Sequence, residues 1–395
     1  MITNGFTYIA FLMFVAGALL FLQKTTKWKV FDLIPPLVWI YVLHMIFCTV
    51  GLYDMEATKP AYNSFKNNLL YAMIFVMLLR CDFRKLAKLG LRMIAIFLGC
   101  SLTLAIGTFA GFPIFEGFMG GAESSWAAVA ALYASWVGGS ANMAAMAAAF
   151  EKSLDPSAYG AALALDTVCY SVWIALLLMA VKIAPKWNSM CKADTSKLDE
   201  VAKVANAQMT EKKVPTSGDW IFLIGLSLMV SVFGQKLGTV MNDGLVAVGL
   251  DMFGASTCTT VIVTVFGLIC AMTPMGKLAA VEELSSVYLY IVVSLLASRA
   301  SLTDLVTAPM WVVYGFFILV VHVVLMFILS KLFKWDLCMV STASLANIGG
   351  SASAPIVATA YDPNFAGIGV LMGVLGAAIG NFCGLAMGAL LQMFV

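Results

Sequence analysis

The spacing of apolar residues along this chain restricts it to one class of fold. Long apolar runs recur from one end to the other, and most polar stretches between them are short. Many runs approach the about 20 residues that a helix needs to cross a bilayer. Helices are the expected form, because a backbone exposed to lipid must satisfy its own hydrogen bonds. The twelve runs lie at 5–22, 34–52, 65–79, 93–112, 126–150, 157–181, 219–234, 256–272, 286–298, 309–333, 337–360 and 365–395.

The composition agrees with a polytopic membrane protein. Of the 395 residues, 62% are hydrophobic and 11% are charged, whereas soluble domains are roughly 45–50% apolar and about 25% charged. The net charge is only +2, and basic residues gather in short loops between apolar runs. Such loops set the orientation in a membrane and give no support for nucleic-acid binding. The expected partner is a lipid bilayer, and the expected location is the bacterial cytoplasmic (inner) membrane.

Cysteine and histidine usage argues against a metal or disulfide framework. The nine cysteines form no Cys-x-x-Cys pair and fall mostly inside apolar runs, and the chain has only two histidines. Cysteines in such surroundings behave as small buried residues. No cofactor is therefore expected, with a bound Na⁺ ion as the one candidate.

Two basic segments predict opposite orientations for the two halves. The loop at 80–92 holds five Arg and Lys residues, and Lys331 and Lys334 precede the run at 337–360. Loops rich in Lys and Arg stay in the cytoplasm. The runs at 126–150 and 337–360 should therefore enter the membrane from opposite sides.

The number of runs conflicts with this inversion. Twelve crossings would place corresponding helices six apart, and therefore parallel. Inversion needs one crossing more or fewer, and the weakly apolar stretch at 238–254 is the candidate for a thirteenth span. Between the halves, the polar stretch at 183–218 is typical of an aqueous linker, with a short surface helix at about 197–209.

The most informative motif is a diglycine that occurs at corresponding places in the two halves. Gly-Gly-Ser-Ala begins at Gly138 and again at Gly349, 211 residues later, each time within an apolar run. An Asp-Pro turn and another long run follow both copies. Each glycine in a helix interior costs about 1 kcal/mol relative to alanine. Both helices are therefore expected to break here.

Paired breaks in corresponding membrane helices indicate a transport site near the middle of the bilayer. The freed backbone groups need partners in protein or in a water-filled cavity. The ends of the half-helices also carry partial charges of roughly +0.5 and −0.5. We therefore expect two crossing broken helices. The alternative is close packing of small residues between continuous helices.

Asp166 is the acidic residue that lies deepest within an apolar run. A charged side chain at the centre of a membrane helix costs about 2.5–3.5 kcal/mol, which makes a functional role the default hypothesis. We expect Asp166 to accept a proton, to coordinate Na⁺, or to balance the N-terminal ends of the half-helices. The alternative is a carboxyl group that is satisfied by neighbouring hydroxyls or kept protonated.

Other small and polar residues near the breaks are candidates for binding a solute or an ion. Their hydroxyl and amide oxygens can act as ligands, although some must cap the interrupted backbone. Asn381 is the approximate counterpart of Asp166, with interhelical hydrogen bonding as its alternative role. For His322 the same bonding is favoured over proton relay. The candidate set is Ser135, Gly138, Gly139, Ser140, Asn142, Asp166, Asn347, Gly349, Gly350, Ser351, Ser353 and Asn381.

The same segments resemble a known family. Residues 137–142, the run around Asp166, and residues 346–350 with the glycine-rich last run are similar to the DUF819 (YjcL-like) family over nearly the whole chain. That family is grouped with the cation:proton antiporter/anion transporter superfamily. The resemblance implies an all-α polytopic membrane protein with about 12–13 transmembrane helices and two inverted repeats. It also implies a core domain that moves against a panel domain, as in elevator transport.

The resemblance further implies that the two diglycines are the crossing points and that Asp166 is the acid of the core. Leu165 precedes Asp166, whereas electrogenic exchangers pair two adjacent aspartates, which counts against pure Na⁺/H⁺ exchange. The expected divisions are a first repeat at 1–182 (panel 1–60, core 65–182), a linker at 183–218, and a second repeat at 219–395 (panel 219–280, core 284–395).

The leading functional hypothesis is a secondary transporter for a small polar or anionic organic solute, by symport or exchange with Na⁺ or H⁺. A monovalent cation/proton antiporter is the alternative. An intramembrane enzyme is not expected, because the sequence lacks HExxH and GxSxG motifs and a second deep acid. A sensor or scaffold role lacks the sizeable soluble domain that would relay a signal. Homodimers are common among the transporters that the chain resembles.

Overall fold

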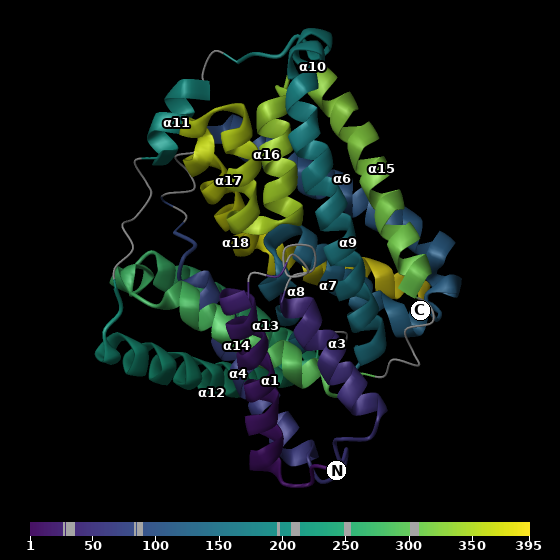
Figure 1. Cartoon of the computed structure of the whole chain (residues 1–395), viewed down its shortest axis with the longest axis vertical. Coiled ribbons are helices and arrows are strands. Elements are labelled where there is room, and N and C mark those ends of the chain that lie inside the picture. The colour runs from purple at the N-terminus through teal and green to yellow at the C-terminus, as the bar shows by residue number, and fades with distance from the viewer. Residues whose placement is uncertain are drawn as a thin grey trace.

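The computed structural model describes residues 1–26, 28, 36–82, 84, 90–195, 198–206, 214–248, 254–300 and 308–395, and nearly all of them are helical (Figure 1). The first half contains α1 (Gly5–Thr26), α3 (Pro36–Thr49), α4 (Lys59–Leu78), α6 (Gly90–Phe115), α7 (Ala122–Gly138), α8 (Ser140–Ala149) and α9 (Pro156–Ala180). The second contains α12 (Ser217–Ala247), α13 (Ala255–Ala271), α14 (Val281–Ala297), α15 (Ala308–Phe333), α16 (Leu337–Ile348), α17 (Gly350–Tyr361) and α18 (Ala366–Leu391). Between them lie α10 (Ala184–Cys191) and α11 (Leu198–Asn206).

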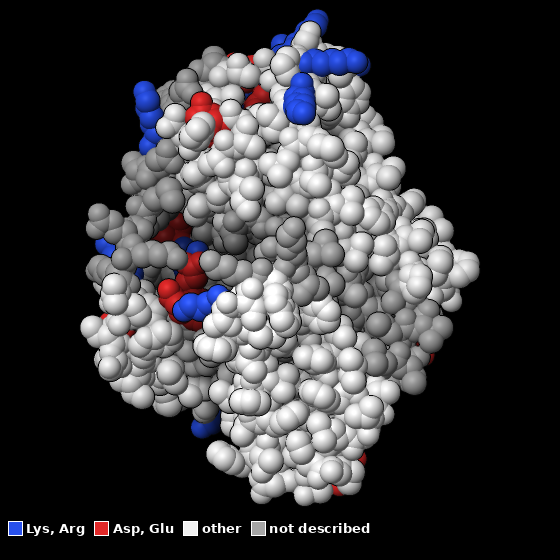
Figure 2. All heavy atoms as spheres, viewed as in Figure 1, with Lys and Arg blue, Asp and Glu red and all other residues white. Residues whose placement is uncertain are grey.

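The described helices are those of a membrane protein. Six helical stretches are long and apolar enough to cross a bilayer, judged by length and composition, and α3, α13 and α16 are shorter apolar helices. In the view of Figure 2, charged side chains gather toward the upper and left edges, and most of the remaining surface is uncharged. An uncharged surface of this kind, as seen on this face, suits contact with lipid.

The helices form two groups, and both can be followed in Figure 1. The lower group contains α1, α3, α4, α12, α13 and α14. The upper group contains α6 to α9 and α15 to α18. The sequence-based division placed α4 and α14 in the core, but both pack mainly within the lower group. Their apolar side chains find partners there, as where Phe75 of α4 stacks on Phe266 of α13 with ring centroids 5.9 Å apart.

The first diglycine interrupts a helix, but the two half-helices do not continue in one direction. α7 ends at Gly138 and α8 begins at Ser140. Trp126, near the start of α7, packs edge-on against Phe150, just after α8, with ring centroids 5.0 Å apart. Along a straight path these rings would lie more than roughly 30 Å apart. The chain therefore reverses, and we call α7–α8 hairpin 1.

The second diglycine also reverses the chain. The Ser341 hydroxyl in α16 and the Tyr361 hydroxyl at the end of α17 lie 3.1 Å apart, so these helices form hairpin 2. The expectation of two crossing broken helices is therefore wrong, because each pair of half-helices folds back on itself. Glycine makes both reversals feasible: Gly139 has φ +98° and Gly350 has φ +68°, a backbone conformation without steric penalty for glycine.

The expected thirteenth span at 238–254 is also wrong. α12 runs without interruption from Ser217 to Ala247, so the first part of that stretch forms its last turns. Residues 249–253 lie outside the described part of the chain. The surface helix expected in the linker is present as α11, but its buried Ala202 and Ala205 show that one face is packed rather than solvated. It lies against α18 and the short 3₁₀ helix that precedes α18.

α6 and α15 lie side by side and run in opposite directions. Arg92, near the start of α6, donates to the carbonyl oxygen of Lys334, just after α15, at 2.8 Å. Tyr314, near the start of α15, donates to the carbonyl oxygen of Thr108, toward the end of α6, also at 2.8 Å. α6 and α15 correspond to each other in the two halves, because each immediately precedes a hairpin. The two corresponding helices are therefore antiparallel.

α18 carries a strip of glycines against which both hairpins pack. A Cβ on Gly373 would lie 2.2 Å from the Cα of Ser351 in hairpin 2, and one on Gly376 would lie 2.2 Å from the Val137 carbonyl oxygen in hairpin 1. Only a residue without a side chain allows such approaches. The strip continues at Gly369, Gly380, Gly384 and Gly388. The backbone of α18 thus brings the two hairpins together.

Candidate functional site

The tips of the two hairpins meet. A Cβ on Gly350 would lie 4.0 Å from the Cα of Gly139. These glycines are the second members of the two diglycines, 211 residues apart. The repeated motif of the sequence is therefore brought to a single place in the fold.

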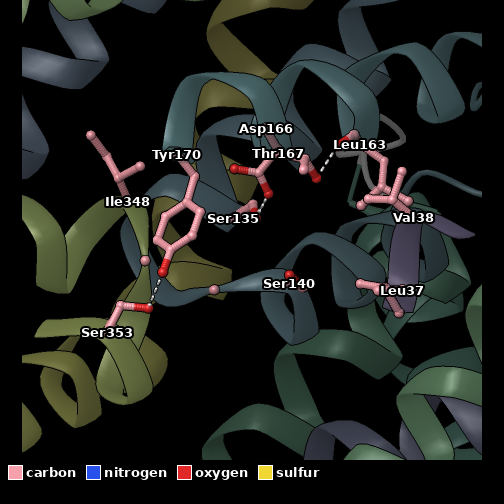
Figure 3. A pocket seen from close by; sticks show the side chains of 12 residues that line it. Leu37, Val38, Ser135, Ser140, Leu163, Asp166, Thr167, Tyr170, Ile348 and Ser353 are labelled. Atoms are coloured by element: carbon pink, nitrogen blue, oxygen red, sulfur yellow. Dashed lines mark hydrogen bonds between the residues drawn. The ribbon is translucent and has the colours of Figure 1, made fainter. Parts of the chain in front are cut away.

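A cavity of about 250 Å³ lies between the tips, α9 and α3 (Figure 3). Both hairpins and both groups of helices line it. Hairpin 1 contributes Ser135, Gly139 and Ser140, hairpin 2 contributes Ile348, Gly349 and Ser353, α9 contributes Leu163, Asp166, Thr167 and Tyr170, and α3 contributes Leu37 and Val38.

Asp166 is held by two neutral donors of hairpin 1. The Ser135 hydroxyl donates to Oδ2 at 2.9 Å, and the Trp136 indole nitrogen donates to Oδ1 at 2.8 Å. The residue is 9% exposed. Each carboxylate oxygen keeps further acceptor capacity. Asp166 is the only acidic or basic side chain among the described residues that line the cavity.

Tyr170 joins α9 to hairpin 2 across the cavity. It lies one turn after Asp166, and residues four apart share one face of a helix. Its hydroxyl and that of Ser353 are 2.9 Å apart (Figure 3). Its ring also lies against hairpin 2, since a Cβ on Gly349 would come within 2.7 Å of it. One face of α9 therefore contacts both hairpins near their tips.

An equivalent bond joins α18 to hairpin 1. Asn142 donates through Nδ2 to Oδ1 of Asn381 at 2.9 Å. Ser353 lies 211 residues after Asn142, and Asn381 lies 211 residues after Tyr170. Each bond therefore joins a helix of one half to the hairpin of the other half. The positions in the second bond are the equivalents of those in the first, with the two halves exchanged.

Both helices that leave the tips begin without a side-chain cap. Gly139 precedes α8 and Gly349 precedes α17, and neither can cap its helix. The first amides of a helix lack acceptors within it, and this end carries roughly +0.5 charge. Since both glycines line the cavity, two positive helix ends adjoin it.

Six of the twelve residues predicted from the sequence line this cavity, and six do not. The six lining residues are Ser135, Gly139, Ser140, Asp166, Gly349 and Ser353. The others have places beside it. Gly138 and Ser351 pack against α18. Asn142 and Asn381 form the bond between hairpin 1 and α18, and the Asn347 amide oxygen accepts from Ser101 of α6 at 2.7 Å.

Sequence reasoning missed several lining residues. Tyr170 could have been found, because it lies four residues after Asp166 and so shares a helix face with it. Thr167 is the next residue after Asp166 and lacks this spacing. Leu37, Val38, Leu163 and Ile348 carry no signal that separates them from other apolar residues. Trp136 does not line the cavity, but its indole nitrogen donates to Asp166.

His322 bonds between helices, as expected. Its Nδ1 lies 2.7 Å from the Thr103 hydroxyl of α6, and its Nε2 lies 2.8 Å from the Ser344 hydroxyl of hairpin 2. The Trp173 indole of α9 donates to the same Ser344 hydroxyl at 3.0 Å. His322 thereby links three neighbours of α15 away from the cavity.

Comparisons with known proteins place this architecture in a family. The chain is similar to the uncharacterized membrane protein YjcL of Bacillus subtilis (strain 168), with 25% identity over 367 residues, which cover 89% of this chain and 88% of that protein. A family model described as a protein of unknown function, DUF819, matches residues 10–394. With nearly its whole length matched, this chain belongs to the DUF819 family.

Proposed function

We propose that this protein is a secondary active transporter of the elevator type, which moves a small polar or anionic organic solute coupled to Na⁺ or H⁺. The meeting of two hairpin tips beside Asp166 at a cavity carries the proposal. Unwound backbone within a membrane is tolerated only where protein buries it or where it lines a water-filled cavity. Paired interruptions at corresponding positions mark transport sites. The proposed role is binding and movement, without enzymatic chemistry.

The hairpins support two inverted repeats. A hairpin that leaves the bilayer on the side where it entered adds no crossing. Each half then has five crossing helices, α1, α3, α4, α6 and α9 in one and α12, α13, α14, α15 and α18 in the other. An odd number inverts the second half, in agreement with the antiparallel α6 and α15. In this proposal, crossings that are missing account for the inversion, and no added crossing is needed.

We take the lower group as the panel and the upper group as the core. The first panel–core boundary then falls after α4, and the second after α14. Hairpin 1 is attached to this panel. The Lys66 ammonium group of α4 lies 2.6 Å from the Glu151 carboxylate after α8, and the Thr257 hydroxyl of α13 donates to the Ala149 carbonyl oxygen at 3.0 Å. None of the described panel helices packs to a comparable extent on hairpin 2.

This difference between the hairpins supports a proposal for the conformation. The basic residues at the start of α6 and the end of α15 mark the cytoplasmic side, and hairpin 2 begins there. Because the described panel helices leave hairpin 2 largely uncovered, hairpin 2 is the one free to open. Since it begins on the cytoplasmic side, the cavity of this conformation faces the cytoplasm. Movement of the core along the panel would release hairpin 1 and cover hairpin 2.

Asp166 supplies the coupling in this proposal. Moving a bare carboxylate through the bilayer is costly, so the core should move only when Asp166 is neutralised. A proton or a Na⁺ ion would do so, and hydroxyl and carbonyl oxygens near the tips suit a hard cation. Neutralisation of Asp166 would thus permit movement of the core and couple the movement of the solute to that of the cation.

The first test replaces the carboxylate. Solutes are first identified with purified protein by thermal shift against organic acids, amino acids, small peptides and sugars, with and without Na⁺. In proteoliposomes, Asp166→Asn should abolish gradient-driven uptake of the solute. Asp336→Asn is the matched control, since Asp336 is also a buried aspartate but caps α16, a role that Asn fills equally well. Undiminished coupled uptake by Asp166→Asn would reject the assignment.

A monovalent cation/proton antiporter is the second candidate. It is favoured by the single charged side chain in the lining, because a cation site alone needs no more than a carboxylate and neutral oxygens. A pulse of Na⁺ or K⁺ would then change the internal pH of proteoliposomes without any solute. Solute-dependent flux with no such pH change would favour the first proposal.

A further inference from the structure

We propose that the solute is a small zwitterion, whose ammonium group binds at Asp166 and whose carboxylate binds at the uncapped ends of α8 and α17. This inference rests on the proposed transport function and names the class of solute. It follows from the charge around the cavity, which is negative at α9 and positive at the hairpin tips.

The negative wall is the buried carboxylate of Asp166. Both of its oxygens accept bonds from neutral groups, Ser135 and Trp136. No Lys, Arg or His lies among the described residues of the lining. An ionised carboxylate in such surroundings is stable only with a cationic partner. An ammonium group is such a partner, and its three donors match the remaining acceptor capacity of the carboxylate.

Tyr170 adds to this wall. It projects from α9 into the cavity together with Asp166 (Figure 3). The hydroxyls of Tyr170 and Thr167 also offer oxygen acceptors. An aromatic ring beside a carboxylate attracts an ammonium group by cation–π interaction, whereas it offers little to a second carboxylate.

The positive wall is formed by the tips. Gly139 and Gly349 line the cavity immediately before α8 and α17. The first amides of these helices lack acceptors within the helix, and a carboxylate at a helix N-terminus satisfies such groups. The Ser140 hydroxyl, also in the lining, is a further donor. Two ends of roughly +0.5 each balance a single carboxylate.

The size of the cavity limits the solute. About 250 Å³ is available, less than the about 300–1,000 Å³ of sites for drug-sized ligands. Leu37 and Val38 close the side toward α3. An amino acid with a short side chain fits this space. A dicarboxylate would place its second negative charge close to Asp166, which like-charge repulsion disfavours.

The mode of coupling follows. The ammonium group, Na⁺ and H⁺ would all neutralise the same carboxylate, so they exclude one another. The core then moves either with the zwitterion or with a cation on Asp166. We therefore expect exchange of solute for cation, and weaker solute binding at high Na⁺ concentration or low pH.

The test compares matched three-carbon compounds on the purified full-length protein by calorimetry. Alanine carries both charges, propionate only the carboxylate, and propylamine only the ammonium group; glycine, serine and proline extend the zwitterions. We expect at least one zwitterion to bind about tenfold or more tightly than the single-charge compounds, the effect of one charge-assisted contact. Asp166→Asn should remove this preference, and Asp336→Asn should keep it. Na⁺ should raise the Kd of the zwitterion competitively.

Three results would overturn the inference: equal binding of alanine and propionate, an unchanged preference in Asp166→Asn, or no binding by any zwitterion. Coupled flux of another solute would still support the proposed transporter in each case. Absence of any coupled flux would instead reject the transporter itself. If Asp166→Asn fails to fold, the test is whether Na⁺ competes with the zwitterion for binding to the unaltered protein. Independent binding of Na⁺ and zwitterion would contradict a shared site at Asp166.

Discussion

The two hairpins carry the same motif at their tips but differ in what surrounds them. Hairpin 1 is bound to the lower group of helices through Lys66–Glu151 and Thr257–Ala149. Hairpin 2 is bonded to α9 through Tyr170–Ser353 and Trp173–Ser344, and the described lower helices leave it largely free. In the proposed elevator mechanism, equivalent motifs in unequal surroundings correspond to one of two conformations. In that mechanism, hairpin 1 would be the fixed hairpin and hairpin 2 the one that opens.

The largest effect is expected at the ion pair that fixes hairpin 1. The Lys66 side chain is 5% exposed and that of Glu151 is 32% exposed. Glu151→Gln leaves a buried ammonium group unpaired and should lower the free energy of unfolding by about 3 kcal/mol. Lys66→Met should cost less, because Glu151 can be hydrated. Unfolding in bicelles measures the free energy of unfolding of both variants. Equal losses would contradict the claim that Lys66 is buried and Glu151 is partly exposed.

The next effect tests whether both hairpins depend equally on α18. The added methyl group of Gly373→Ala would lie 2.2 Å from the backbone of hairpin 2, and that of Gly376→Ala would lie 2.2 Å from the backbone of hairpin 1. Overpacking of this kind costs about 1–3 kcal/mol, and we expect similar losses of thermal stability. Gly225→Ala is the control, since open space surrounds that position in α12 and alanine favours a helix by about 1 kcal/mol. A destabilised control would show that the method does not report on packing.

The smallest effect separates the free hairpin from the fixed one. Tyr170→Phe removes the bond to Ser353 and should cost about 0.5–1.5 kcal/mol. Its main consequence should be faster dissociation of solute, measured by stopped-flow binding. Asn142→Ala removes the equivalent bond in hairpin 1 and leaves the amide oxygen of the buried Asn381 without this donor. This should cost about 1–3 kcal/mol of stability and should change solute dissociation less. The reverse pattern would exchange the roles of the hairpins.

Much of the fold could be predicted from the sequence. Each of the twelve apolar runs corresponds to a helix or a hairpin, because hydrophobic length is a direct signal of membrane helices. The breaks at Gly138 and Gly349 were also predictable, since glycine weakens a helix. The direction taken after each break was not. A diglycine only permits a reversal, and contacts far along the chain, such as Trp126 with Phe150, determine it.

The candidate site shows the same limit. Asp166 stood out because a charge in an apolar run is costly, and Tyr170 follows it at helical spacing. Asn142 and Asn347 looked equally suitable as ligands, yet both bond to neighbouring helices beside the cavity. Which side of a half-helix faces the cavity depends on how α6 and α18 pack against it. That packing has no local signal in the sequence.

The reversal of each hairpin has a consequence for biogenesis. A segment that returns to its own side of the bilayer leaves the orientation of everything after it unchanged. In the proposed topology, the long helices can therefore be inserted and oriented by their basic loops before either hairpin is in place. The interrupted backbone at Gly139 and Gly350 then needs to enter only a space that protein already lines, so it is not exposed to lipid.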